Sequence, residues 1–244
     1  MKNSVLILGA RSDIGMAIAH RFAQDGHPVQ LAARCVDTLE ADCADIALRY
    51  GVDVTLHEFD ALDTASHGAF VDALPDLPVT AVCTVGYMGN QLENEKDLQA
   101  AVQVMRSNYE GPASILAELA NRFAHNGGGT LVGISSVAGD RGRATNYVYG
   151  SAKAGFTAFL SGLRNRLASN GVHVVTVLPG FVATRMTQGI DLPARLTAQP
   201  QEVADAVFAA VEKKKNVIYV RSVWWLIMAI IRNVPEAIFK KLKI

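Results

Sequence analysis

Cysteine is scarce in this sequence, and the three that it contains show no pattern of a disulfide framework or a metal site. Cys35, Cys43 and Cys83 include no Cys-x-x-Cys pair and show no metal-ligand spacing with the six histidines. Disulfides are therefore not expected, and we predict no metal site. Cysteines that are few and unpaired are typical of the reducing cytoplasm, where we expect the protein to work.

The sequence also lacks net charge and a secretion signal. Lysine plus arginine and aspartate plus glutamate number 23 each, so there is no general basic footprint for nucleic acid. The apolar run at residues 5–8 is too short for the core of a signal peptide. No internal repeat or low-complexity linker interrupts the chain. At 244 residues and 50% hydrophobic content, the chain can bury one large core, which predicts a single domain.

Short apolar runs alternate with segments of helical periodicity through residues 1–220. The predicted strands are residues 5–8, 29–33, 52–59, 80–85, 130–134, 172–178 and 217–220. The predicted helices are residues 14–23, 37–49, one or two helices within 92–123, the segment after Tyr149, and a helix from Pro200. This alternation predicts an α/β fold, a Rossmann-type doubly wound parallel sheet with helices on both faces. The ligand crevice is then expected outside the carboxyl ends of the strands.

A loop with two glycines joins the first predicted strand to the first helix. Gly9 gives a tight turn, and Gly15 allows close backbone approach where helix N–H groups could receive a diphosphate. Asp13 replaces the usual middle glycine, so a plain strand-to-helix turn is the alternative. The candidate cofactor-binding residues of this loop are Gly9, Arg11, Ser12, Asp13, Ile14 and Gly15.

The end of the second predicted strand carries no carboxylate. Ala33 and Arg34 occupy the place where an acid commonly holds the ribose hydroxyls of NAD. With Arg34 and Arg11 near the ribose, a 2′-phosphate is the better partner, which predicts NADP; the alternative is that Arg34 starts a solvated turn. Asp60 and Asp63 could cap the next helix or contact an adenine. We assign capping to Asp63 and cofactor contact to Asp60.

A tyrosine and a lysine four residues apart are the main candidates for chemistry. Tyr149 and Lys153 should lie on one face of a helix, one turn apart. A free tyrosine loses its proton near pH ~10 and is a poor acid–base catalyst at neutrality. A cation ~4 Å away could lower the tyrosine pKa by ~3 units at an effective dielectric of ~20, but not in bulk water. Such pairs also occur on solvated helices, so the residues around Tyr149 and Lys153 must decide whether the pair is catalytic.

Taken together, these residues resemble the short-chain dehydrogenase/reductase family over about residues 3–220. The matching elements, all in the family's order, are Gly9-x5-Gly15, Asn108, Ile134-Ser-Ser136, Tyr149-x3-Lys153 and Pro179-Gly180 followed by Thr184. The resemblance implies an NADP-binding Rossmann-fold catalytic domain over residues 1–220. It also implies an oxidoreductase that acts on CH–OH and C=O groups.

The resemblance further implies a catalytic set. Tyr149 would protonate the oxygen of a carbonyl that receives a hydride from the nicotinamide, and Ser136 would hydrogen-bond that oxygen. Ser136 precedes Tyr149 by thirteen residues, the spacing typical of the family, whereas Ser135 is one position early. Lys153 would lower the pKa of Tyr149 and bind the nicotinamide ribose, and Asn108 would hold a water that links Lys153 to solvent. Further cofactor contacts are implied for Gly86, Tyr149, Lys153, Pro179, Gly180, Val182 and Thr184.

The substrate is less defined. Residues 86–91, the cofactor turn and Arg141-Gly-Arg143 look more like the branch that reduces a keto-sugar, a 2-ketoribose, carried on polyprenyl phosphate. Asp13, the run Cys83-Thr-Val-Gly86 and Ala152 depart from common family residues, but none of them removes a catalytic group. The alternatives are a soluble member acting on a sugar, steroid or acyl carbonyl, and an NADP-sensing protein without turnover. Residues 181–199 are predicted to cover the substrate.

The C-terminal segment, residues 221–244, is predicted to be an amphipathic helical tail. Its nine apolar residues at 223–231 make about 13.5 Å of helix, against ~30 Å for a bilayer core, so they are not expected to span a membrane. Residues 213–244 carry eight basic residues and one acidic residue. The two tryptophans in this apolar run, together with Lys240, Lys241 and Lys243 further along, favour peripheral contact with the cytoplasmic face of an anionic membrane. The alternative is packing on the fold or on a second subunit, since the family often forms homo-oligomers.

Overall fold

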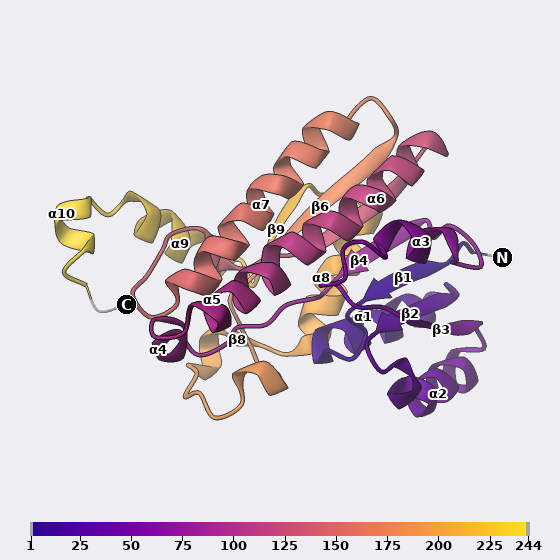
Figure 1. Ribbon diagram of the computed structural model, residues 1–244, viewed down its shortest axis with the longest axis horizontal. Helices are drawn as coiled ribbons and strands as arrows, with labels where there is room; N and C mark the ends of the chain where they lie inside the picture. Colours follow the sequence, from indigo (N-terminus) through magenta and orange to yellow (C-terminus); the bar gives the residue numbers. More distant parts are fainter. Residues whose placement is uncertain (1, 243–244) are drawn as a thin grey trace.

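The computed structural model, which describes residues 2–242, is built around a parallel sheet (Figure 1). Expectations for Met1, Lys243 and Ile244 lie outside the described residues. Seven strands pair in the order β3-β2-β1-β4-β5-β6-β9. Their bounds are β1 Val5–Leu8, β2 Val29–Ala33, β3 Val54–Glu58, β4 Thr80–Cys83, β5 Gly129–Ile134, β6 Val172–Pro179 and β9 Val217–Val220. The order reverses between β1 and β4, which confirms the doubly wound Rossmann-type sheet.

Helices cover both faces of the sheet. Because side chains alternate along a strand, Val5 and Ile7 of β1 pack on one face and Leu6 and Leu8 on the other. The first face is covered by α1 Asp13–Gln24, α2 Glu40–Tyr50 and α8 Pro200–Glu212; the second is covered by α3 His67–Asp72, α6 Gly111–His125 and α7 Tyr147–Leu167. Burial of β1 on both sides explains its unbroken apolar sequence.

The predicted helical stretch 92–123 is divided. It contains α4 Gln91–Asn94, α5 Leu98–Met105, a π-helical turn at Arg106–Glu110, and then α6. A π-helical turn accommodates one extra residue within a helix and re-aims its side chains. Asn108 lies in the middle of this turn.

The capping role predicted for Asp63 is wrong. Helix α3 begins only at His67, after Ser66, which makes no side-chain capping hydrogen bond. Asp63 instead accepts a hydrogen bond from the Ser66 hydroxyl through its backbone carbonyl, and the Asp60 carboxylate accepts from the backbone N–H of Leu62 at 2.9 Å. Both acids therefore lie in the turn that precedes the helix.

The segment after β6 folds back on the body through short elements. It contains the parallel pair β7 Phe181–Val182 and β8 Thr197–Ala198, with 3-10 turns at Arg185–Thr187 and Ala194–Leu196. A cover over the substrate stays a prediction for this segment.

The tail lies at one end of the molecule (Figure 1). It forms α9 Val223–Asn233 and α10 Glu236–Phe239. Trp224 and Met228 are buried, and the Trp224 indole N–H donates to the Leu196 carbonyl at 3.1 Å. The Arg141 guanidinium donates to backbone carbonyls at the end of α9 and stacks on Phe239. Within residues 2–242, the longest apolar helices still fall short of what crossing a membrane requires.

Candidate active site

The carboxyl ends of the central strands meet at one edge of the sheet. The register aligns Leu8 of β1 with Cys83 of β4, and Cys83 with Gly133 of β5. The cofactor loop after β1, the glycine loop after β4 and the serines after β5 therefore leave the sheet side by side. This edge is where ligands bind in open parallel sheets.

The cofactor loop is held by hydrogen bonds that leave no room for side chains at its glycines. Gly9 has a φ of +86°, and a Cβ there would lie 2.9 Å from the Thr84 hydroxyl. A Cβ at Gly15 would lie 2.7 Å from the Gly9 carbonyl. Ser12 caps α1 by accepting from the Gly15 N–H at 2.9 Å, and its hydroxyl donates to the Gly9 carbonyl at 2.8 Å. The backbone is thus exposed to a ligand at the positively polarised end of α1.

Thr84 is a site residue that sequence reasoning did not assign. Its hydroxyl is 3.0 Å from the carbonyl oxygens of Leu8 and Gly9 and 3.0 Å from the Ser12 hydroxyl. It therefore fastens the cofactor loop to the end of β4. The available signal was its place at the end of a predicted strand, just before Gly86.

A cavity of about 650 Å³ lies along this edge and joins most of the predicted cofactor residues. Its lining includes the predicted residues Gly9, Arg11, Ser12, Asp13, Ile14, Arg34, Asp60, Gly86 and Thr184. Within the part of the chain that the structure describes, the lining leaves out the predicted residues Gly15, Tyr149, Lys153, Pro179, Gly180 and Val182. Gly180 instead lies under the Trp224 indole, and Val182 is buried in the core.

Two arginines line this cavity near the end of β2. Arg11 and Arg34 both line it, and the Arg11 guanidinium donates to the Arg34 carbonyl at 3.2 Å. The nearby Glu58 carboxylate is occupied, because it accepts from the backbone N–H groups of Cys35 at 3.0 Å and Val36 at 2.9 Å. Glu58 thereby holds the turn that carries Arg34. The residues fit a dinucleotide whose ribose carries a phosphate.

Helix α7 carries Tyr149 and Lys153 one turn apart. The Lys153 ammonium is buried, donates to the Ile134 carbonyl at 2.9 Å, and lies 5.7 Å from the centre of the Tyr149 ring. Burial lowers the pKa of Lys153 to about 8. Burial raises the pKa of Tyr149 to about 12, against a smaller lowering by the Ser136 hydroxyl. The expected lowering of the Tyr149 pKa by Lys153 is therefore not seen: burial sets the direction of the shift, and the Lys153 ammonium donates to the Ile134 carbonyl instead.

The two serines after β5 have different surroundings. The Ser135 hydroxyl is 3.0 Å from the Lys153 backbone carbonyl and 2.7 Å from the Thr157 hydroxyl, so it braces α7. Ser136 accepts from the Ala138 N–H at 3.1 Å and begins the 3-10 helix Val137–Gly139. Ser136 is thus the serine whose hydroxyl hydrogen-bonds to Tyr149 and lowers its pKa.

Two glycines that were not singled out hold this serine segment against α7. A Cβ at Gly139 would lie 2.7 Å from the Ala154 N–H nitrogen, and a Cβ at Gly150 would lie 2.8 Å from the Ala138 carbonyl. Both positions therefore require glycine for the close approach. The small residues around Lys153 were the available signal.

Asn108 is fully buried beside Lys153. Its side-chain amide donates to the Val104 carbonyl at 2.8 Å, and its carbonyl oxygen accepts from the Tyr87 N–H at 3.2 Å. A Cβ at Gly86 would lie 2.9 Å from the Asn108 oxygen and 3.4 Å from the Lys153 nitrogen. Asn108 and Lys153 thus converge on the backbone of Gly86. The π-helical turn explains how Asn108 points inward rather than to solvent.

The sequence matches a known protein family over most of its length. The family model described as short chain dehydrogenase matches residues 3–194. The chain belongs to the short-chain dehydrogenase/reductase family. An uncharacterized oxidoreductase of Mycobacterium tuberculosis is 39% identical over 241 residues, which is 98% of this chain and 96% of the relative. An uncharacterized oxidoreductase of Streptomyces coelicolor is 36% identical over 243 residues, which is 98% of this chain and 95% of the relative.

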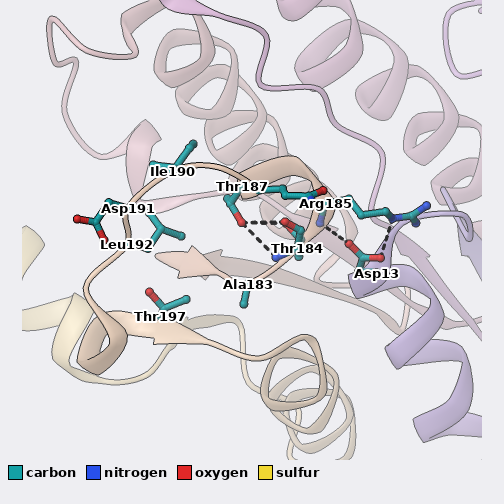
Figure 2. Close-up of a pocket in the computed structure, with 10 residues that line it drawn as sticks. Asp13, Ala183, Thr184, Arg185, Thr187, Ile190, Asp191, Leu192 and Thr197 are labelled. Atoms are coloured by element: carbon teal, nitrogen blue, oxygen red, sulfur yellow. Dashed lines mark hydrogen bonds and ion pairs between the residues drawn. The ribbon is translucent and has the colours of Figure 1, made fainter.

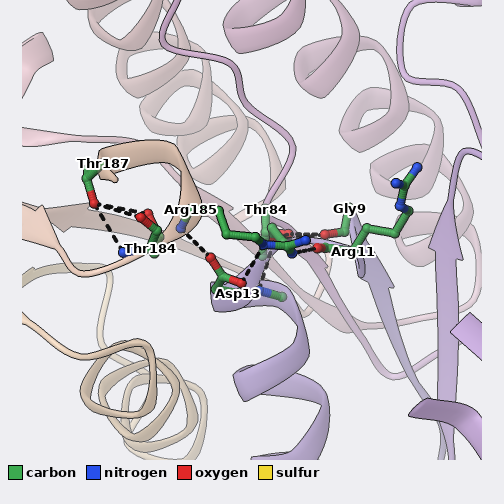
Figure 3. Close-up of polar contacts among 9 residues, drawn as sticks. Gly9, Arg11, Asp13, Thr84, Thr184, Arg185 and Thr187 are labelled. Carbon is green, nitrogen blue, oxygen red and sulfur yellow. Dashed lines mark hydrogen bonds and ion pairs between the residues drawn. The ribbon is translucent and has the colours of Figure 1, made fainter. Parts of the chain in front are cut away.

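Solved structures of short-chain dehydrogenases have the same fold. One from Sphingobium yanoikuyae, in complex with NADPH, has a TM-score of 0.81 at 25% identity, covering 97% of this chain and 98% of that one. One from Burkholderia cenocepacia, in complex with NADP, has a TM-score of 0.83 at 22% identity, covering 98% and 97%. In this short-chain dehydrogenase, the Asp13 carboxylate pairs with the Arg185 guanidinium (Figure 3).

Proposed function

We propose that this protein is an NADPH-dependent carbonyl reductase, with oxidation of the matching alcohol as its reverse reaction. The observation that carries the proposal is the convergence of Asn108 and Lys153 on Gly86, at the edge of a cavity with two arginines at its β2 end. Tyr149 lies one helical turn from Lys153, and the Ser136 hydroxyl hydrogen-bonds to Tyr149. Membership in the family supports an oxidoreductase that acts on CH–OH and C=O groups.

The proposed roles follow from protonation states. When bound, NADPH supplies the hydride that adds to the carbonyl carbon. Tyr149 is protonated at neutral pH and can donate its hydroxyl proton to the carbonyl oxygen; burial, which raises its pKa to about 12, opposes that donation, and the Ser136 hydroxyl favours it. The Ser136 hydroxyl holds that oxygen. Lys153, with a pKa of about 8, keeps most of its positive charge at neutral pH and would bind the nicotinamide ribose.

NADP rather than NAD is the proposed cofactor. Arg11 and Arg34 would hold a 2′-phosphate, and the occupied Glu58 carboxylate would not compete for the ribose hydroxyls. The NADPH and NADP complexes of structural neighbours support the same choice. Gly9, Ser12 and Gly15 would receive the diphosphate.

Turnover is tested by following NADPH absorbance with a panel of ketones, keto-sugars and steroid ketones. Deuterium placed on the nicotinamide should appear on the carbinol carbon of the product. NADPH that binds but is not consumed with any substrate, membrane lipid extract included, would favour the NADP-sensing alternative. NADH consumed as efficiently as NADPH would contradict the assigned cofactor.

We further propose that the protein acts on a lipid-linked keto-sugar while its tail rests on an anionic membrane. The face of α9 opposite the buried Trp224 is apolar and exposed: Trp225 is 60% exposed, Leu226 54% and Ile230 62%. Lys240 and Lys241, exposed just beyond α10, would meet anionic headgroups. Together these features support an interfacial helix anchored by tryptophan and lysine.

Liposome cosedimentation tests the membrane proposal. Ile230→Ser should reduce binding to anionic liposomes, whereas Leu48→Ser, which removes an 89% exposed leucine from α2, should not. Equal binding by wild type and Ile230→Ser would refute the contact. Incubation with NADPH and membrane lipids should then convert a lipid-linked keto-sugar to a product with two more hydrogens.

A second subunit is proposed for another surface. Leu98, Val102, Met105 and Tyr109 recur at helical spacing along α5 and the π-helical turn, and they are 75%, 40%, 41% and 43% exposed. Such a stripe supports contact with an identical subunit. Light scattering should report a homo-oligomer that Val102→Glu dissociates; a monomeric wild type would contradict this.

A further inference from the structure

Asp13 and Arg185 join two distant parts of the cofactor site. Arg185 lies in the 3-10 turn after β7, and its backbone N–H donates to the Asp13 carboxylate at 2.7 Å. Its guanidinium donates to the same carboxylate at 2.9 Å and to the Arg11 carbonyl. Figure 3 shows the Arg11 side chain pointing away from Asp13. Within residues 2–242, Arg185 is the ion-pair partner of Asp13.

A carboxylate at this place opposes the binding of a diphosphate. Asp13 is the first residue of α1, where the helix end favours an anion. In a chain that binds NADP there, the carboxylate and the diphosphate would repel each other at short range. A cation is therefore needed beside them, and Arg185 is the one that the fold brings there.

The Asp13–Arg185 pair also lies between two cavities. Asp13, Thr184 and Arg185 line both the cofactor cavity and a second cavity of about 600 Å³. The second cavity is open to solvent and is lined mainly by residues between Ala183 and Thr197 (Figure 2). The Arg185 side chain is 68% exposed, and ion pairs this exposed hold their partners weakly. The guanidinium can thus exchange the carboxylate for a stronger bidentate anion.

We propose that Arg185 is a binding residue for the cofactor's diphosphate, released from Asp13 when NADPH binds, and that it draws residues 183–192 toward the cofactor. This rests on the proposed NADPH dependence. Asp13 holds the guanidinium in place before binding. The position of the segment around the second cavity then depends on whether the cofactor is bound.

A double-mutant cycle on NADPH affinity tests the proposal, measured by calorimetry on the whole chain. Arg185→Gln should weaken binding about tenfold, as for loss of a hydrogen bond to a charged group. Asp13→Asn should tighten binding, because it removes the repulsion and frees Arg185. Arg185→Gln should still weaken binding when made in the Asp13→Asn background. Arg195→Gln, which removes an exposed charge from the same segment, is the control and should leave affinity unchanged.

The outcomes separate the possibilities. If the double variant binds NADPH as tightly as Asp13→Asn alone, Arg185 only screens Asp13 and the proposal is overturned. Hydrogen exchange of residues 183–192 should slow on NADPH binding in wild type but not in Arg185→Gln; equal slowing in both would also overturn it. A wild type that binds NADPH and reduces carbonyls while Arg185→Gln binds equally well defeats this inference alone. A wild type that does not bind NADPH defeats the proposed function as well.

Discussion

Replacing Gly86 with alanine should disrupt catalysis through two residues at once. The added Cβ would lie 2.9 Å from the Asn108 side-chain oxygen and 3.4 Å from the Lys153 nitrogen, and the first distance is too short for either group to stay in place. Moving Asn108 strains its hydrogen bonds with Val104 and Tyr87 in a fully buried place, which costs about 1–3 kcal/mol. For a domain of this size, each kcal/mol lowers the melting temperature by about 2–4 °C. A misplacement near 1 Å at the site can cost about a hundredfold in rate.

The assay is steady-state NADPH oxidation combined with thermal unfolding. We expect kcat to fall about tenfold to a hundredfold, with a moderate loss of stability. Gly162→Ala is the matched control, because it makes the same change on α7 where no atom lies within 4 Å of the new Cβ. It should keep full activity and gain about 0.5–1 kcal/mol of stability. Wild-type kcat in Gly86→Ala would refute the convergence of Asn108 and Lys153 on this position.

Three other predictions concern protonation, cofactor choice and the tail. Because burial lowers the pKa of Lys153 to about 8, its charge is present below that pH and lost above it, so kcat/KM for NADPH should fall as pH rises through about 8; a flat profile to pH ~10 would contradict this. Arg34→Ala should weaken NADPH binding about tenfold and leave NADH binding unchanged. Equal losses of affinity for both cofactors would contradict a contact between Arg34 and the 2′-phosphate. Trp224→Ala should lower the free energy of unfolding by about 3–5 kcal/mol, whereas Trp225→Ala should change it by less than about 0.5 kcal/mol. Similar denaturation midpoints for the two tryptophan variants would mean that α9 is not docked as described.

The strands and their parallel arrangement could be predicted because each is a local apolar run bounded by turns. The placement of Tyr149 and Lys153 one turn apart could be predicted because spacing along a helix is a local property, and α7 carries both residues. Their catalytic roles stay a prediction. The start of α3 at His67 could not be predicted. Aspartate is a favourable N-cap residue, which pointed to Asp63, whereas the residue that precedes α3 is Ser66, and its side chain makes no capping hydrogen bond. A helix start depends on tertiary packing as well as on its cap.

Properties that depend on distant residues could not be predicted either. The pairing of Asp13 with Arg185 joins residues 172 positions apart. The pKa of Tyr149 is set by burial, which only the packed α7 determines. In the tail, Trp224 packs inward, whereas Trp225, its neighbour in sequence, faces solvent. The sequence pattern of nine apolar residues did not separate these two faces.

The central claim is that Tyr149 delivers the proton beside bound NADPH, and Tyr149→Phe tests it most directly. The variant lacks only the hydroxyl, so NADPH affinity should stay within about twofold of wild type, while carbonyl reduction should fall by about a hundredfold to ten-thousandfold. Tyr147→Phe is the control, because Tyr147 is 45% exposed at the start of the same helix and should keep wild-type activity. Carbonyl reduction by Tyr149→Phe at the wild-type rate would contradict the account.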